Sequence, residues 1–244
     1  MPNLTNRARW WIVVVFALAM AWVESAAVYY LRTLIDRIVP YQPNPLPVIG
    51  GLGPVEQARE LATMIMLFTV GVLAGRSWRG RLGYSAVAFG VWDISYYLFL
   101  KWMCAWPHSL LDWDILFLLP LPWWGPVLAP VLIALLLIAW GTLASQFERP
   151  QFSWRVKATV WGMNVAGVAL ALYVFMADAV RVASLGVEEI RHALPSRFNW
   201  PLFGVALTLM SVPILEIIWT IRLLEIKASN TPSARGSNRP QVTV

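Results

Sequence analysis

The chain contains six apolar runs of about 20 residues each, separated by short polar connections. As an α-helix rising about 1.5 Å per residue, such a run crosses a hydrocarbon layer about 30 Å thick. A backbone in lipid must satisfy its own hydrogen bonds, so each run is predicted to be a transmembrane helix. The predicted spans cover residues 10–31, 56–75, 83–102, 127–145, 158–180 and 200–224.

The composition agrees with a membrane protein. Of the 244 residues, 59% are hydrophobic and 13% are charged, whereas about a quarter of an ordinary soluble domain is charged. The predicted fold class is therefore an all-α membrane protein, a bundle of about six transmembrane helices. It forms one domain over residues 1–227, followed by a polar, disordered cytoplasmic tail at 228–244. The single cysteine, Cys104, excludes an intrachain disulfide.

The net charge of +6 raises the question of a nucleic-acid partner. The Lys and Arg residues are scattered over short loops rather than gathered on one basic helix, so no nucleic acid is predicted to bind. The positive-inside rule explains them better, because Arg76, Arg79 and Arg81 crowd the connection between the second and third spans. Both termini are predicted to be cytoplasmic. The lipid bilayer is the predicted partner, and many of the 15 Trp residues lie near the ends of the spans.

The stretch between the third and fourth spans differs from the others. It is apolar and aromatic, but it is interrupted by prolines that a regular spanning helix cannot accommodate. These prolines are Pro107, Pro120, Pro122, Pro126 and Pro130. An interfacial or re-entrant segment is predicted here, with a short helix over Ser109–Leu119.

Asp93 is the most conspicuous polar residue of the spans. It lies roughly 15 Å from Gly83 along the third span, near the middle of the bilayer. A carboxylate at that depth costs about 2.5–3.5 kcal/mol on insertion scales. Tyr97 and Lys101 follow at i+4 and i+8, so an acid, a phenol and an amine are predicted to share one helix face.

Most acidic residues fall toward the predicted outer side. Glu24 and Glu60 lie at depths of roughly 9 and 6 Å, so with Asp93 they could line one cavity open to the periplasm. In the alternative interpretation, the two glutamates reach the interface and only pair with nearby cations. The predicted polar site consists of Asp93, Tyr97, Lys101, Glu24, Glu60, Arg32 and Arg59.

No metal site is predicted. His108, Asp112 and Asp114 are the nearest candidates, since imidazole and carboxylates suit zinc, iron or manganese, but their spacing matches no metal-binding motif. An alternative is that the two aspartates cap a helix end and pair with loop residues. The chain has no P-loop, no Gly-x-Ser-x-Gly and no His-Glu-x-x-His, so catalytic residues and cofactors are left open.

Four polar segments stand out in the first half of the chain: Glu24-Ser-Ala-Ala-Val-Tyr-Tyr-Leu-Arg32, Glu56-x-x-Arg59-Glu60, Phe-Gly-Val-Trp-Asp93 and Trp106-Pro-His-Ser-Leu-Leu-Asp-Trp-Asp114. They resemble parts of an uncharacterised bacterial family of polytopic integral membrane proteins. The resemblance covers about the first 130 residues and implies a location in the bacterial inner membrane.

Three functions fit these observations. The favoured one is a small-solute transporter or permease in which Asp93, Glu60 and Glu24 receive a cation or a proton. The second is an intramembrane enzyme that acts on a lipid-like substrate, with Asp93 or Asp112 as acid or base. The third is a non-catalytic membrane subunit of a larger complex, which uses its tryptophan-rich surface against partner subunits.

Overall fold

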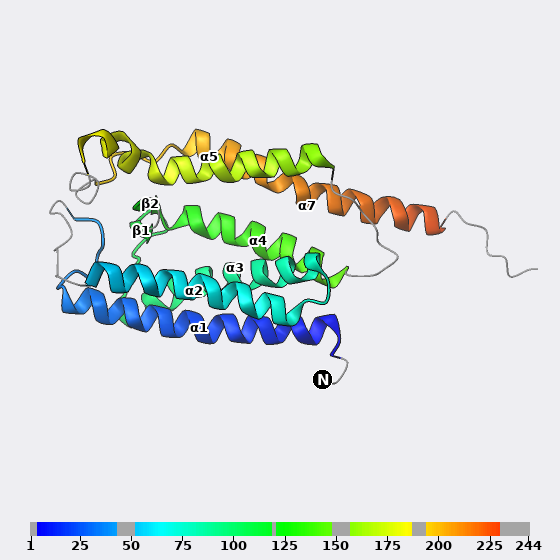
Figure 1. Ribbon diagram of the computed structural model, residues 1–244, viewed down its shortest axis with the longest axis horizontal. Helices are drawn as coiled ribbons and strands as arrows, with labels where there is room; N and C mark the ends of the chain where they lie inside the picture. The colour runs from blue at the N-terminus through cyan, green and yellow to red at the C-terminus, as the bar shows by residue number, and fades with distance from the viewer. Residues whose placement is uncertain (1–3, 43–51, 119–120, 148–156, 187–193, 230–244) are drawn as a thin grey trace, which may run out of the picture.

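The computed structural model describes residues 4–42, 52–118, 121–147, 157–186 and 194–229. Within them, six long helices lie side by side along the long axis of the molecule and alternate in direction (Figure 1). The helices are α1 (Asn6–Leu34), α2 (Leu52–Ala74), α3 (Trp78–Cys104), α4 (Leu128–Gln146), α5 (Ala158–Val182) and α7 (Trp200–Ser229). A 3-10 turn, η1 (Ala183–Leu185), extends α5. Of the predicted tail at 228–244, the first two residues belong to α7, and residues 230–244 lie outside the described residues.

The prediction of an all-α membrane protein is confirmed at this level. Each predicted span overlaps one long helix, and five of the six helices are long and apolar enough to cross a membrane. The exception is α3, which has 27 residues and therefore ample length, at about 1.5 Å per residue. It carries Arg79, Arg81, Asp93 and Lys101, and these charges make it less apolar than the others.

Helix α3 occupies the centre of the first four helices. It packs against α1, α2 and α4, whereas α1 and α2 have few contacts with each other. Glycines let α3 approach α4 closely: a Cβ atom added to Gly141 would lie 2.4 Å from the Gly83 carbonyl oxygen. One added to Gly90 would lie 2.6 Å from the Ala134 carbonyl oxygen. Small residues at helix crossings are typical of membrane bundles, because close backbone contact replaces the hydrophobic driving force.

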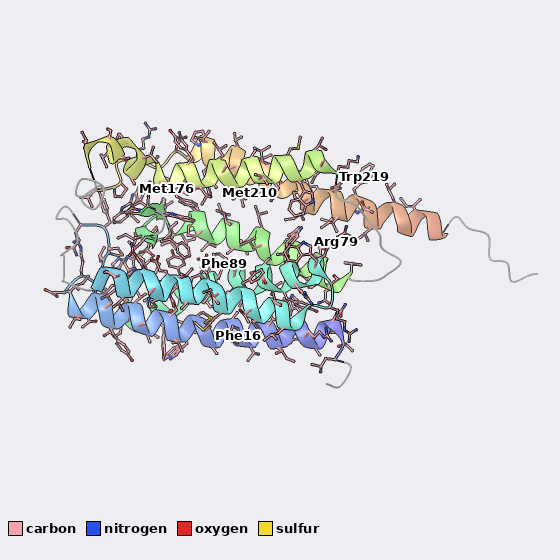
Figure 2. All side chains as sticks on the ribbon, in the orientation of Figure 1. Phe16, Arg79, Phe89, Met176, Met210 and Trp219 are labelled. Atoms are coloured by element: carbon pink, nitrogen blue, oxygen red, sulfur yellow. The ribbon has the colours of Figure 1, made fainter. Side chains whose placement is uncertain are left out.

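Helices α5 and α7 form a second unit. They pack along each other, with Gly167 against the backbone of Ala206 and the side chain of Met210. Figure 2 shows Met210 in this part of the molecule. The pair joins the first four helices through contacts of α7 with α4 and of α5 with the segment before α4.

That segment is a β-hairpin, so the predicted short helix over Ser109–Leu119 is wrong. Strand β1 (Trp113–Phe117) pairs antiparallel with β2 (Trp123–Pro126), and Asp114 lies opposite Gly125. Aromatic and β-branched residues in Trp-Asp-Ile-Leu-Phe favour a strand. The pairing also gives this irregular stretch backbone hydrogen bonds where few water molecules would be available. The hairpin lies between the α5–α7 pair and the layer of α1–α3 (Figure 1).

The ends of α3 direct the chain into the hairpin. Ser77 caps its N-terminus by accepting a hydrogen bond from the Gly80 N–H at 3.1 Å. At its C-terminus Ala105 adopts a left-handed conformation with φ of 58°, which ends the helix. The chain then turns back through Trp106, which is fully buried.

The outer surface of the bundle is apolar. Leu73 is 81% exposed, and Val23, Leu98 and Trp219 are each more than 60% exposed. Large apolar patches of this kind are rare on soluble monomers. Together with the five candidate spans, they indicate contact with a lipid bilayer.

Candidate functional site at the hairpin end of the bundle

A buried ion pair connects α1 to the hairpin. Arg32 Nη2 lies 2.8 Å from Asp114 Oδ1, and the two side chains are 9% and 1% exposed. Tyr97 on α3 also acts on the Asp114 carboxyl and favours its charged form. The Arg32 guanidinium lies over the Trp106 ring, 4.2 Å from its centroid, in a cation–π contact. Three separate parts of the chain therefore meet at the Asp114 carboxylate.

Asp93 is the fourth member of this group, which we call the Arg32 cluster (Arg32, Asp93, Tyr97 and Asp114). Asp93 lies one helical turn before Tyr97 on α3 and is 8% exposed. Its carboxylate interacts electrostatically with the Asp114 carboxylate and with the Tyr97 phenol. One oxygen of each carboxylate, Oδ2, is buried without a hydrogen-bond partner among the described residues.

The environment of Asp114 contains opposing influences. Burial raises the pKa of the Asp114 carboxyl above its ordinary value. The Arg32 guanidinium, followed by the Tyr97 hydroxyl and the Ile115 N–H, acts against that rise in pKa. The ion pair is therefore what keeps a charge on a carboxylate that is almost entirely shielded from solvent.

A second polar group, the Arg59 cluster (Glu24, Glu56, Arg59 and Thr63), lies between α1 and α2. Arg59 pairs with Glu24 through Nη1 and donates to Glu56 from Nε at 2.9 Å. Glu24 also accepts a hydrogen bond from the Thr63 hydroxyl at 3.0 Å. Tyr96 on α3 interacts electrostatically with both Arg32 and Arg59, so the two clusters are neighbours.

Glu60 holds the far end of strand β1. Its Oε2 accepts a hydrogen bond from the Leu118 N–H at 3.0 Å, and the residue is 8% exposed. Glu60 also interacts electrostatically with Arg59 and with Glu56, which lies one turn earlier on α2. The three predicted site acids, Glu24, Glu60 and Asp93, are thus all buried at the hairpin end of the bundle.

Lys101, His108 and Asp112 lie away from these clusters. Lys101 is exposed and donates to the Ala105 carbonyl at the end of α3, so its ammonium caps a helix terminus instead of extending the row from Asp93. The exposed His108 pairs with Asp112, Nδ1 to Oδ2 at 3.4 Å, whereas Asp114 faces Arg32. No group of three His, Cys, Asp or Glu side chains in the described ranges is placed to hold a metal ion.

Among the described residues, carboxyl groups outnumber guanidinium groups in this part of the bundle. The two clusters and Glu60 contain five carboxyl groups, those of Glu24, Glu56, Glu60, Asp93 and Asp114, and two guanidinium groups, those of Arg32 and Arg59. A third guanidinium, that of Arg37, is buried just after the end of α1. A low-dielectric environment strengthens the repulsion among unpaired carboxylates. The arrangement therefore favours uptake of positive charge, either as protons on the carboxyl groups or as a bound cation.

The sequence does not indicate several residues of these clusters as parts of the polar site. It suggests Asp114 only as a metal-ligand candidate or a helix cap, and it does not single out Glu56, Thr63, Tyr96 and Trp106. One signal was available for Asp114, since β-favouring residues surround it and a strand places alternate side chains on opposite faces. The partner of Asp114 in α1 is 82 residues away, and local spacing contains no information about it.

Comparisons with known proteins add no assignment. No protein-family model matches the chain, and no curated protein or solved structure matches it. The fold and the buried polar clusters define a multi-pass helical membrane protein. No family is identified for it, so the resemblance to a bacterial membrane-protein family supports only the proposals that follow.

Proposed function

We propose that this protein is a cation- or proton-linked permease for a small solute, located in a bacterial inner membrane. The observation that carries the proposal is the excess of buried acids over buried cations among the described residues, Glu24, Glu60, Asp93 and Asp114 against Arg32 and Arg37. Ionisable side chains are expensive inside membrane proteins, and those that are present commonly mark ion and substrate routes. The excess of acids favours a cationic or protonated species over an anion.

The proposed topology has six membrane spans, which are the five candidate spans and α3. Helix α3 is long enough to cross the bilayer, and α1, α2 and α4 shield its polar groups from lipid. The alternating helices bring the beginning of α1 and the end of α7 to the end of the bundle away from the hairpin (Figure 1). Arg79 lies at that same end (Figure 2). The positive-inside rule then makes that end cytoplasmic and the hairpin end periplasmic.

A permease also needs polar groups in its cytoplasmic half. Two residues of the α5–α7 pair supply candidates. Asn164 donates a hydrogen bond to the Met210 carbonyl at 3.4 Å, and Glu216 keeps a buried Oε2 without a partner among the described residues. These groups support a route along the contact of α7 with α4, which leads from the hairpin toward the cytoplasm.

Reconstitution into liposomes tests the proposal. The lumen would contain a pH-sensitive dye, a potential negative inside would be imposed with potassium and valinomycin, and amines, amino acids and sugars would be added outside in turn. At least one solute class should cause acidification or sodium-dependent uptake faster than in protein-free liposomes. Asp93→Asn should abolish it, whereas Asp178→Asn should not, because Asp178 pairs with Arg181 near the end of α5. Absence of protein-dependent flux for every solute class would contradict a permease.

A further inference from the structure

The Arg32 cluster holds two carboxyl groups and one guanidinium. Asp93 and Asp114 are 8% and 1% exposed, and Arg32 pairs directly with Asp114. If both carboxyl groups were ionised, the cluster would have a net negative charge with almost no access to water. Burying a charge without a partner is strongly unfavourable, and a carboxylate avoids this penalty by taking up a proton.

The unpartnered oxygens identify where positive charge is missing. Asp93 Oδ2 and Asp114 Oδ2 are both buried and accept no hydrogen bond from any described residue. Buried polar atoms in native proteins nearly always have a hydrogen-bond partner. Two buried acceptors without a partner, on two acids of one cluster, therefore indicate that a hydrogen-bond donor is missing there. A proton on one carboxyl group supplies that donor and also cancels the excess charge.

Within the described residues, no Lys or Arg forms an ion pair with Asp93. Arg32 on α1 is engaged by Asp114, and Arg59 on α2 is engaged by Glu24 and Glu56. Glu60 on α2 accepts from the Leu118 N–H, and α3 itself adds Tyr96 and Tyr97 near Asp93. Helix α4 contains no Asp, Glu, Lys, Arg or His. The acid therefore lies in an apolar and aromatic environment in which the charged group that acts on it, Asp114, has the same sign.

We propose that Asp93 and Asp114 together bind one proton and form the proton-binding site of this protein. In the loaded state one carboxyl group is a neutral acid and the other keeps its ion pair with Arg32. Release returns the proton to water at the hairpin end and leaves two carboxylates beside a single guanidinium. The pair titrates as a unit, so the proton is assigned to the pair and not to one oxygen. This assignment rests on the proposed function for its role in transport, but it is testable without transport.

A proton fits these residues better than a metal ion. Sodium, calcium and magnesium need several oxygen ligands, and magnesium and calcium commonly take about six to eight. The described residues contain no set of three acidic, His or Cys side chains around one point. A proton needs only one carboxyl group to hold it, and the pair offers two.

Infrared spectroscopy of the purified protein in detergent tests this site. At neutral pH, the difference spectrum of wild type minus Asp93→Asn should contain the carbonyl stretch of a protonated carboxyl group, and the band should shift in deuterium oxide. Glu60→Gln is the matched control, because it removes a buried acid of α2 outside the pair and should retain the band. Absence of a protonated-carboxyl band from the difference spectrum of wild type minus Asp93→Asn would overturn the proposal.

Tyr97→Phe gives a second measurement that does not need Asp93 to be replaced. Loss of the hydroxyl removes a polar group that favours the charged form of Asp114, so the pair should hold its proton more tightly. The band should then persist to higher pH in Tyr97→Phe than in wild type. An unchanged titration would contradict the assignment.

Sodium is the competing ion. Thermal unfolding at fixed pH should be the same in sodium chloride and in an organic-cation chloride of equal ionic strength. A stabilisation by sodium that disappears in Asp93→Asn would show that the pair binds sodium and would overturn the proton assignment. A protein with the expected infrared band but no flux in liposomes would refute only the permease, so the two failures are distinguishable.

Discussion

Arg32 on α1 and Asp114 on strand β1 form an ion pair between segments 82 residues apart, and this pair fastens the hairpin to the first helix. Both side chains are almost fully shielded from solvent. The contact therefore has the character of a buried ion pair, for which removal of one partner is far more damaging than removal of both.

The first prediction concerns this pair. Arg32→Gln should lower the free energy of unfolding by about 3–5 kcal/mol, because Asp114 is left as an uncompensated buried charge. The double variant with Asp114→Asn should lose less than the sum of the two single variants. Thermal unfolding in detergent measures each loss. Arg181→Gln is the control, since Arg181 is 59% exposed in its pair with Asp178 and should contribute about 1 kcal/mol or less. Additive losses in the double variant would mean that Arg32 and Asp114 do not stabilise each other.

The second prediction concerns the contact of α3 with α4. Gly141→Ala should destabilise the protein, because the new Cβ would meet the Gly83 carbonyl oxygen at 2.4 Å, and backbone atoms cannot move away cheaply. The overpacking should cost about 1–3 kcal/mol. Gly162→Ala is the control, since nothing lies within 4 Å of its added Cβ and alanine favours a helix. Equal melting temperatures for the two variants would mean that α3 and α4 are farther apart than described.

The third prediction concerns Glu60 and the hairpin. Glu60→Gln keeps an oxygen that can accept from the Leu118 N–H, so it should be nearly neutral. Glu60→Leu removes the acceptor and should cost about 1–3 kcal/mol for the unpaired N–H. Hydrogen exchange of the Leu118 amide is the direct readout, and it should accelerate only in Glu60→Leu. Equal exchange in both variants would show that this hydrogen bond does not hold the strand.

The fourth prediction concerns topology. A reporter that is active only in the cytoplasm, fused after Ser77, should be active, because Ser77 lies in the arginine-rich connection before α3. A reporter that is active only in the periplasm, fused after Gly51, should also be active. Silence of either fusion would reject the proposed orientation.

Much of the fold follows from the length and spacing of apolar residues. All six predicted spans coincide with helices, because in lipid a run of about 20 apolar residues has almost no alternative. The hairpin was missed because Ser109–Leu119 was interpreted as helical, although Trp113, Ile115 and Phe117 favour a strand. The prolines correctly indicated that this stretch is not a regular spanning helix, but they did not indicate that it forms a β-hairpin.

The candidate site was accessible to prediction only in part. Local spacing identified Asp93, Glu24 and Glu60 as unusual, because charges in apolar runs are expensive wherever they fall in the fold. Their partners depend on how distant helices rotate against one another, which local spacing does not determine. Lys101 illustrates this limit to prediction. It follows Asp93 at i+8, and its side chain is exposed near the end of α3 instead of lying beside Asp93.

The position of α3 has a consequence for biogenesis. The helix with the least apolar composition is also the one that α1, α2 and α4 surround. On leaving the ribosome, α3 should partition poorly into lipid by itself, and its insertion should depend on helices synthesised before and after it. The close connection of α2 to α3 through Gly75–Ser77 keeps the two together during that step. A nascent chain that ends at Cys104 should therefore leave α3 only partly inserted, and synthesis of α4 should complete its entry into the membrane.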